Sequence, residues 1–249
     1  QADCLKPQLS STMESAAPLL AVEAVSKRYG ALTVTDTLSL RVPAGQALGI
    51  IGPNGAGKTT LLNLIGGDVR PDAGRVVFDG REITALRPSE RCRAGIGRSY
   101  QIPHPFVGMT VYENVLVGST FGAERSDSDA EDHALQVLER TGLLHHANAL
   151  AGSLRLLDRK RLELARALAT QPRLLLLDEI GGGLTEHELH ELIETIRAIR
   201  SEGVTIVWIE HIVHALLAVV DRLVAINFGK LLADGEPHAV MADPMVREI

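Results

Sequence analysis

The glycine-rich segment Gly52–Thr60 constrains the fold of this chain more than any other feature of the sequence. It reads GPNGAGKTT and satisfies the pattern G-x-x-x-x-G-K-[ST]. The segment follows an apolar run, Gln46–Ile51, that is predicted to be a buried strand, and it opens a predicted helix, Lys58–Ile65. Backbone N–H groups in such a turn surround phosphate oxygens, and the helix N-terminus adds positive potential. The sequence therefore predicts a phosphate-binding P-loop within an α/β fold.

Two side chains of this segment are predicted to contact the reacting end of a nucleotide. Lys58 reaches the terminal phosphates as a point charge, and the hydroxyl of Thr59 is a ligand for Mg²⁺. The alternative, a glycine turn that merely precedes a helix, is weakened by the strand–loop–helix context. The residues predicted to bind the nucleotide here are Gly52, Pro53, Asn54, Gly55, Ala56, Gly57, Lys58, Thr59 and Thr60.

A pair of carboxylates ends a second apolar run, Leu174–Leu177. An apolar strand that ends in Asp178 places this carboxylate beside the P-loop, where it is suited to hold Mg²⁺. Glu179 follows directly and is suited to orient or deprotonate an attacking water molecule. The alternative is a strand that ends in a solvated acidic turn, and the presence of the P-loop makes it the weaker interpretation.

Three further polar residues have positions that fit a nucleotide site. Tyr29, which precedes a glycine, is an aromatic platform for adenine. The amide of Gln101 is suited to touch both Mg²⁺ and the attacking water, and His211 is suited to bind the terminal phosphate. Taken singly, each has a simpler interpretation: a core tyrosine, a capping amide and a histidine at a helix start. Their order along the chain, together with the P-loop, favours the functional interpretation.

The remaining segments alternate between β-branched apolar runs and helix-period stretches, as in a layered α/β domain. Leu20–Lys27 and Thr33–Val42 are predicted to be half-exposed antiparallel strands. The pattern turns helical between Thr110 and Leu150, with a polar loop around Ala123–Ser128. Other predicted strands are Arg75–Phe78, Arg173–Leu177, Val204–Ile209, Leu223–Phe228 and Lys230–Ala233, and other predicted helices are Thr110–Val117, Asp129–Thr141, Leu154–Thr170, Glu186–Ser201 and Ile212–Val219.

From about Leu20 to Met241, this order of motifs resembles the ATPase subunits of ATP-binding-cassette (ABC) transporters. The resemblance implies a P-loop core with an antiparallel β subdomain and an inserted α-helical subdomain at about 103–170. It implies one domain over residues 19–249, and we expect residues 1–18 to be a disordered leader or tag. Shorter segments resemble the branch that imports branched-chain amino acids, which also includes ATPases for urea and short amides: Gly97–Gln101, Met109–Val115, Ala165–Pro172 and Ile209–His211.

The same resemblance implies ATP hydrolysis with Mg²⁺ and gives each site residue a role. It implies Mg²⁺ binding at Thr59, Gln101 and Asp178. It implies that Glu179 is the catalytic carboxylate and that His211 senses the γ-phosphate. The expected partners are transmembrane permease subunits, a second ABC ATPase subunit and, indirectly, a substrate-binding protein. The expected location is peripheral, at the cytoplasmic face of the inner membrane.

The segment Leu154–Asp158 departs from the family pattern. It reads LRLLD where the family carries Leu-Ser-Gly-Gly-Gln, whose serine and glycines reach the nucleotide of a dimer partner. Arg155 replaces the serine, and bulky side chains replace the glycines, which are needed for close backbone approach. One interpretation is that the helix dipole alone binds phosphate. The interpretation we favour is a heterodimer with a partner whose own segment is intact, although a homodimer stays open. Next to Glu179, proline is replaced by Ile180.

Charge and composition exclude several other functions. The net charge of −6 disfavours a nucleic-acid partner. Cys4 and Cys92 are too few for a disulfide framework or a zinc site, and no apolar run reaches the ~18 residues that span a bilayer. An ABC ATPase that acts on DNA or ribosomes is one alternative, disfavoured because no zinc module, coiled coil or second cassette is present. Another is a regulatory subunit that hydrolyses ATP weakly, against which Glu179 and His211 argue.

Overall fold

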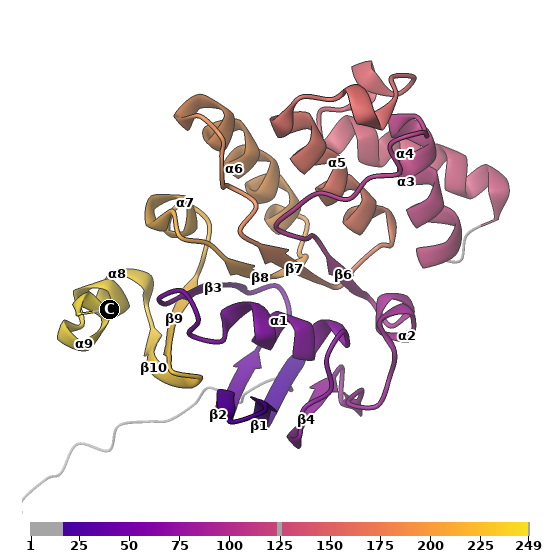
Figure 1. Cartoon of the computed structure of the whole chain (residues 1–249). Coiled ribbons are helices and arrows are strands. Elements are labelled where there is room, and N and C mark those ends of the chain that lie inside the picture. The colour runs from indigo at the N-terminus through magenta and orange to yellow at the C-terminus, as the bar shows by residue number, and fades with distance from the viewer. Residues whose placement is uncertain (1–16, 124–125, 249) are drawn as a thin grey trace, which may run out of the picture.

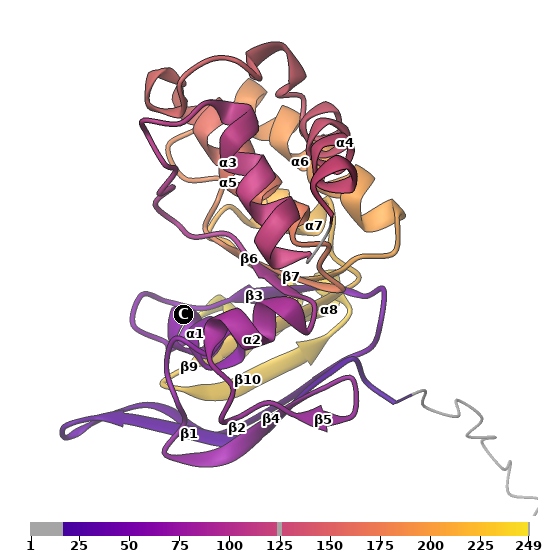
Figure 2. The same cartoon turned by 90° about the vertical axis from the view of Figure 1, so that its right-hand side faces the viewer.

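The fold consists of two sheets and a group of helices (Figures 1 and 2). The computed structural model describes residues 17–123 and 126–248, so the leader or tag predicted at 1–18 lies almost wholly outside the described residues. A four-stranded antiparallel sheet has the order β2-β1-β4-β5, and a six-stranded sheet has the order β10-β9-β3-β8-β7-β6. The predicted fold class, an α/β P-loop core with an antiparallel β part and a helical part, is confirmed.

The antiparallel sheet carries Tyr29 at the tip of its first hairpin. Tyr29 pairs with Leu32 across a turn in which Gly30 has a φ of 61°. Asp79 and Gly80 form the second turn, and both have positive φ values. The strands of this sheet are β1 (Leu20–Tyr29), β2 (Leu32–Val42), β4 (Ala73–Phe78) and β5 (Arg81–Glu82).

The six-stranded sheet brings the candidate site together at one edge. Its strands are β3 (Ala47–Ile51), β6 (Ile96–Arg98), β7 (Leu174–Asp178), β8 (Thr205–Ile209), β9 (Arg222–Asn227) and β10 (Lys230–Gly235). All pairings are parallel except that of β10 with β9. The segments that follow β3, β6, β7 and β8 therefore leave the sheet at the same edge, where ligands of open α/β sheets bind.

The two faces of the six-stranded sheet pack into two separate cores. Successive side chains of a strand point to opposite faces. Leu174 and Leu176 accordingly join the core that contains α1 (Lys58–Gly66) and the antiparallel sheet, whereas Leu175 and Leu177 join the core beneath the other helices. β3, β7 and β8 are buried along their whole length, which explains why they are apolar runs without alternation.

Trp208, in β8, is the only tryptophan of the chain and is fully buried. It belongs to the core beneath the helices. Its indole N–H has no hydrogen-bond partner in the described structure, so the ring is held by apolar packing alone.

A group of helices occupies the region after β6 (Figure 2). Thr110 caps the first helix of this group. The hydroxyl of Thr110 accepts from the N–H of Glu113, and the carboxylate of Glu113 accepts from the N–H of Thr110. A Cβ atom added to Gly118 would lie 2.8 Å from Ala169 Cβ, so glycine allows this region to pack closely on the last helix of the group. The elements are α3 (Val111–Val117), a π-helical segment (Gly118–Gly122), α4 (Asp127–Arg140), short 3₁₀ turns at Leu144–His146 and Ala151–Ser153, and α5 (Leu156–Ala169).

Several boundaries differ from the sequence predictions. α4 begins at Asp127 rather than Asp129, because the carboxylate of Asp127, within the predicted polar loop, is favourable in the first turn of a helix. α5 begins at Leu156 rather than Leu154. The sequence analysis missed β5, β6 and three short helices, α2 (Pro88–Arg93), α8 (Pro237–Ala242) and α9 (Pro244–Arg247). The remaining helices are α6 (Glu186–Ser201) and α7 (Val213–Leu217). None of the helices described is both long and apolar enough to cross a membrane.

Candidate functional site

The P-loop connects β3 to α1 and is closed by Lys58. The ammonium of Lys58 donates to the carbonyls of Gly52 and Pro53 at 2.7 and 3.0 Å, so the side chain folds back over the loop. Burial lowers the pKa of Lys58, and the carboxylates of Glu179 and Asp178 oppose that shift. No side chain caps the N-terminus of α1, which leaves its first N–H groups available to a phosphate.

The three glycines of the P-loop are needed for different structural reasons. A Cβ atom added to Gly57, whose φ is 100°, would lie 2.4 Å from the carbonyl oxygen of Val34. A Cβ atom on Gly52 would lie 2.1 Å from the carbonyl oxygen of Ile226. Gly55 has a φ of 80° but faces open space, with no atom within 4 Å of the position that its Cβ would take. Gly52 and Gly57 are therefore required by packing, whereas the open side of Gly55 is where a phosphate can approach the backbone.

That open side is a groove of about 160 Å³. Its lining combines free backbone donors, one ammonium and two hydroxyls, a donor set that fits a polyphosphate. The residues that line it are Asn54, Gly55, Gly57, Lys58, Thr59, Thr60 and Glu179.

Asp178 lies at the end of β7, beside the start of α1. Its Oδ1 is 3.5 Å from the hydroxyl of Thr59, and the role of these two side chains as metal ligands stays a prediction. Burial raises the pKa of Asp178, and the guanidinium of Arg98 opposes the shift. One carboxylate and one hydroxyl beside a phosphate-binding loop fit Mg²⁺, which prefers oxygen ligands and commonly uses few protein groups together with phosphate.

Glu179 is the centre of the polar cluster. Its Oε2 accepts from the Gln101 amide at 2.6 Å, and its Oε1 lies 2.7 Å from Nε2 of His211. Glu179 has a φ of 48°, which is uncommon for a residue with a side chain and marks a constrained position. Three residues predicted separately from the sequence therefore converge. Gln101 contacts Glu179 rather than Asp178, so its role as a metal ligand stays a prediction.

Tyr29 lies on the hairpin whose second strand adjoins the P-loop at Val34. Its side chain is half exposed, and the ammonium of Lys27 lies 5.6 Å from the ring centroid. An exposed aromatic ring beside a phosphate site is suited to stack on a base, and this role stays a prediction.

The sequence analysis missed two charged residues of the site. Arg98, at the end of β6, donates to Asp178 at 3.4 Å and to Asp68 at 2.6 Å. Glu210, between β8 and His211, is buried and accepts from two backbone N–H groups. Both residues directly follow or end a strand at the site edge, which is the signal that could have identified them.

The altered segment Leu154–Asp158 lies at the start of α5. Arg155 is the N-cap residue and makes no side-chain capping bond. Leu157 is buried, whereas Leu156 is 42% exposed. Leu156 packs against the glycine loop that follows Glu179: its Cδ2 lies 3.2 Å from the position that a Cβ atom on Gly183 would take. The start of α5 thus presents an apolar side chain and a guanidinium.

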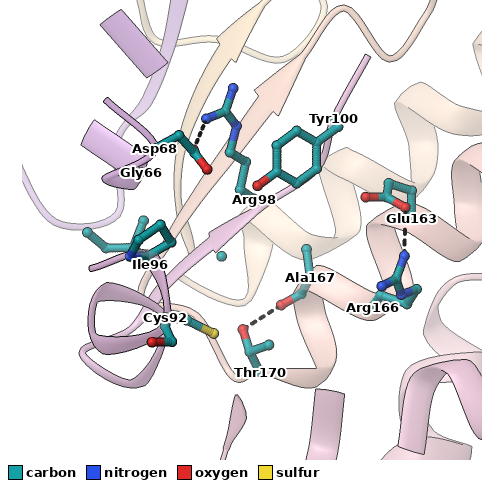
Figure 3. A pocket seen from close by; sticks show the side chains of 13 residues that line it. Gly66, Asp68, Cys92, Ile96, Arg98, Tyr100, Glu163, Arg166, Ala167 and Thr170 are labelled. Carbon is teal, nitrogen blue, oxygen red and sulfur yellow. Dashed lines mark hydrogen bonds and ion pairs between the residues drawn. The ribbon is translucent and has the colours of Figure 1, made fainter. Parts of the chain in front are cut away.

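A second cavity, of about 310 Å³, lies between β6 and the helices α1, α2 and α5 (Figure 3). On one side, Arg98 stacks over Tyr100 at 4.7 Å and pairs with Asp68. On the other side, Glu163 pairs with Arg166 at 3.1 Å. Burial raises the pKa of Glu163, and Arg166 opposes this shift. Arg98, which contacts Asp178, therefore also lines this cavity.

Comparison with known proteins gives consistent matches. Residues 35–181 match the family model described as ABC transporter. The chain is 37% identical to the high-affinity branched-chain amino acid transport ATP-binding protein LivG of Salmonella typhimurium, over 92% of this chain and 96% of that protein. It is 36% identical to the lipopolysaccharide export system ATP-binding protein LptB of Acidithiobacillus ferridurans, over 93% and 95%. The ADP conformation of MJ1267, an ATP-binding cassette of an ABC transporter, superposes with a TM-score of 0.84 at 32% identity, covering 94% of this chain and 98% of that one.

Proposed function

We propose that this chain, which belongs to the ABC transporter family as an ATP-hydrolysing subunit, powers the uptake of branched-chain amino acids or related small amides through partner membrane subunits. The observation that carries the proposal is the contact of Gln101 and His211 with Glu179 beside the P-loop. The importer assignment is supported by the similarity to LivG over nearly the whole of both chains.

The P-loop and Tyr29 would bind ATP. Backbone N–H groups at the start of α1 and the ammonium of Lys58 bind the phosphates, and Tyr29 stacks on adenine. Thr59, Asp178 and Gln101 would hold Mg²⁺, which neutralises phosphate charge when it is bound. Lys58 must then release the two carbonyls to which it donates in this structure.

Glu179 would be the general base. A carboxylate oxygen of Glu179 accepts the proton of the attacking water, and Gln101 and His211 fix the orientation of that carboxylate. The constrained backbone of Glu179 supports this assignment, because strained conformations are common at functional sites. His211 is also placed to donate to the terminal phosphate.

A second ATPase subunit would complete each site, and we favour a heterodimer. The start of α5 in this chain offers Arg155 and Leu156 to a partner's nucleotide in place of serine and glycine. Its own P-loop would be closed by a partner that carries the usual glycines. Fast ATP hydrolysis by this chain alone, equal to that of the mixed pair, would contradict the asymmetric arrangement.

The cavity between β6 and α5 would receive a helix of a permease subunit. Its walls combine an aromatic ring, two arginines and two carboxylates, and it opens next to the contact between Arg98 and Asp178. We place the chain at the cytoplasmic face of the inner membrane, where it is held by these permease subunits. A substrate-binding protein would act on the other side of the same assembly.

The test is Glu179→Gln, assayed with the copurified partner subunits. ATP turnover should fall to background while bound ATP accumulates and a dimer is stabilised, because the amide keeps the shape of the side chain without its basicity. Glu186→Gln on the exposed start of α6 is the matched control and should turn over ATP normally. Turnover that survives Glu179→Gln would refute the catalytic assignment. Uptake of labelled leucine, urea and small amides into vesicles that contain the whole assembly would test the substrate.

A further inference from the structure

Glu210 joins two loops of the site through one buried carboxylate. Its Oε2 accepts from the N–H of Gly181 at 2.8 Å, and its Oε1 accepts from the N–H of His211 at 2.9 Å. Gly181 belongs to the loop that follows Glu179. The side chain is only 2% exposed, so water does not compete strongly for these bonds. Glu210 thereby links the backbone of the loop that carries Glu179 to the backbone of His211.

The charge that faces this carboxylate comes from α5. Lys160 is 5% exposed, and its electrostatic partner is Glu210. Burial lowers the pKa of Lys160, and Glu210 opposes that shift. Because isolated buried charges are unfavourable, the carboxylate of Glu210 makes the buried ammonium of Lys160 less costly.

The three glycines after Ile180 do not have the same role. A Cβ atom added to Gly181 would lie 2.9 Å from Oε2 of Glu210 and 3.0 Å from Cδ1 of Leu189. Gly181 is not among the residues with positive φ, so its backbone would accept alanine. The same holds for Gly182, where the nearest atom to an added Cβ is 3.7 Å away. Gly181 is therefore glycine because the Glu210 carboxylate approaches closely, and Gly182 has no such requirement.

We propose that Glu210 is a positioning residue, which fixes the loop after Glu179 and the backbone of His211 in one arrangement. Both carboxylate oxygens of Glu210 are occupied by backbone N–H groups. Glu210 acts through Glu179 and His211, whose side chains are 2.7 Å apart in this arrangement. The inference rests on the proposed function, because it takes Glu179 as the general base.

Glutamine cannot replace this carboxylate. The amide of Glu210→Gln would keep one oxygen acceptor and would turn an NH₂ group toward the second N–H. Gly181→Ala should disturb the same contact from the other side, because the new methyl group displaces the carboxylate. In both variants we expect kcat to fall by about 10- to 100-fold with little change in KM for ATP, since a small misplacement of catalytic groups has effects of that size. Gly182→Ala is the matched control and should leave kcat unchanged.

Two measurements separate positioning from a merely structural role. Hydrogen exchange should show faster exchange of the Gly181 and His211 amides in Glu210→Gln and no change in Gly182→Ala. The double variant Lys160→Met with Glu210→Gln removes both charges, so it should recover thermal stability but not kcat. If kcat recovers together with stability, charge balance rather than positioning is the role of Glu210, and the inference is overturned.

The outcomes distinguish this inference from the proposed function. If the wild-type assembly does not hydrolyse ATP, the proposed function fails, and the exchange measurement alone then shows whether Glu210 holds the two amides. If the wild type turns over ATP and Glu210→Gln does so at the same rate, the inference fails while the proposed function stands. Unchanged protection of both amides in Glu210→Gln would also overturn the inference.

Discussion

The guanidinium of Arg91 holds the far end of the helix that begins at the P-loop. Arg91 is fully buried and donates to the carbonyls of Leu64 and Ile65, in the last turn of α1, at 2.6 and 2.8 Å. It also donates to the carbonyls of Thr84 and Leu86. The last turn of α1 contains no basic residue, so Arg91 supplies the positive charge that a helix C-terminus favours. The phosphate-binding helix is thereby anchored to the segment before β6.

Arg91→Met keeps most of the volume and removes every donor. Each buried carbonyl left without a partner costs about 1–3 kcal/mol, and the charge at the helix end contributes up to ~2 kcal/mol. These costs are offset in part because the buried guanidinium, whose pKa is lowered by burial, no longer has to be desolvated. The cost of the unpaired carbonyls and of the lost helix-end charge, less this offset, leaves an expected loss of about 3–5 kcal/mol in the free energy of unfolding. It corresponds to a melting temperature lower by roughly 6–20 °C for a domain of this size.

Urea denaturation followed by circular dichroism measures this loss. Arg91→Lys should lie between the wild type and Arg91→Met, because a single ammonium keeps the charge but cannot reach all four carbonyls. The matched control is Arg75→Met, which removes an ion pair with Glu23 whose arginine side chain is 57% exposed. That control should cost less than about 1 kcal/mol. If Arg91→Met costs no more than the control, the anchoring role of Arg91 is refuted.

Three further predictions concern the P-loop and the second cavity. Lys58→Met should lower ATP affinity at least ~100-fold in a titration with a fluorescent analogue, in line with a lost charged contact of about 3 kcal/mol, and an unchanged affinity would contradict its phosphate role. Gly55→Ala should fold, with a loss of about 1–2 kcal/mol in stability because of its positive φ, but it should not bind ATP. Gly57→Ala should not give a stable protein, and equal melting temperatures of the two variants would refute this contrast. Burial raises the folded-state pKa of Glu163 above its ordinary value of 4.5. Above the raised pKa the buried carboxylate is ionised, and this lowers the free energy of unfolding. The loss of stability disappears as the pH falls toward 4.5, where the carboxyl group is protonated in the folded protein. Glu163→Gln should therefore stabilise the protein near neutral pH by an increment that shrinks in acid, and a pH-independent difference in urea midpoints would contradict the burial argument.

The strands and helices with strong local patterns were predictable from the sequence. The run before Asp178 is buried on both faces of its strand, so it contains no polar residue to confuse the pattern. α6 carries a capping box at Thr185 and Glu188, and its predicted range matches the observed one. β6 and α2 were missed because three and six residues are too few to show a period. α8 and α9 have side-chain caps at Glu236 and Asp243 and a proline directly after each, which are local signals that the sequence analysis did not use.

The polar centre of the site was predictable residue by residue but not as an arrangement. The sequence named Gln101, Glu179 and His211 separately, and only the parallel pairing of the strands brings them within hydrogen-bond distance. The position of Glu210 at a strand end could have marked it as a residue of the site, but its bond to the N–H of Gly181, 29 residues earlier in the chain, could not be read from the sequence. A buried carboxylate that binds only backbone groups has no partner side chain that a motif could reveal. These contacts follow from the tertiary structure alone.

The burial of Trp208 gives the chain an intrinsic spectroscopic probe. The ring lies in apolar surroundings with an unbonded indole N–H, which predicts emission at short wavelength. It stands two positions before Glu210 at the end of β8, and it is the only tryptophan in the sequence. Its emission can therefore be assigned without labelling, and an ATP analogue whose absorption overlaps that emission would quench it by resonance energy transfer. Nucleotide binding and rearrangement of this strand end can thus be followed in real time in the unmodified protein.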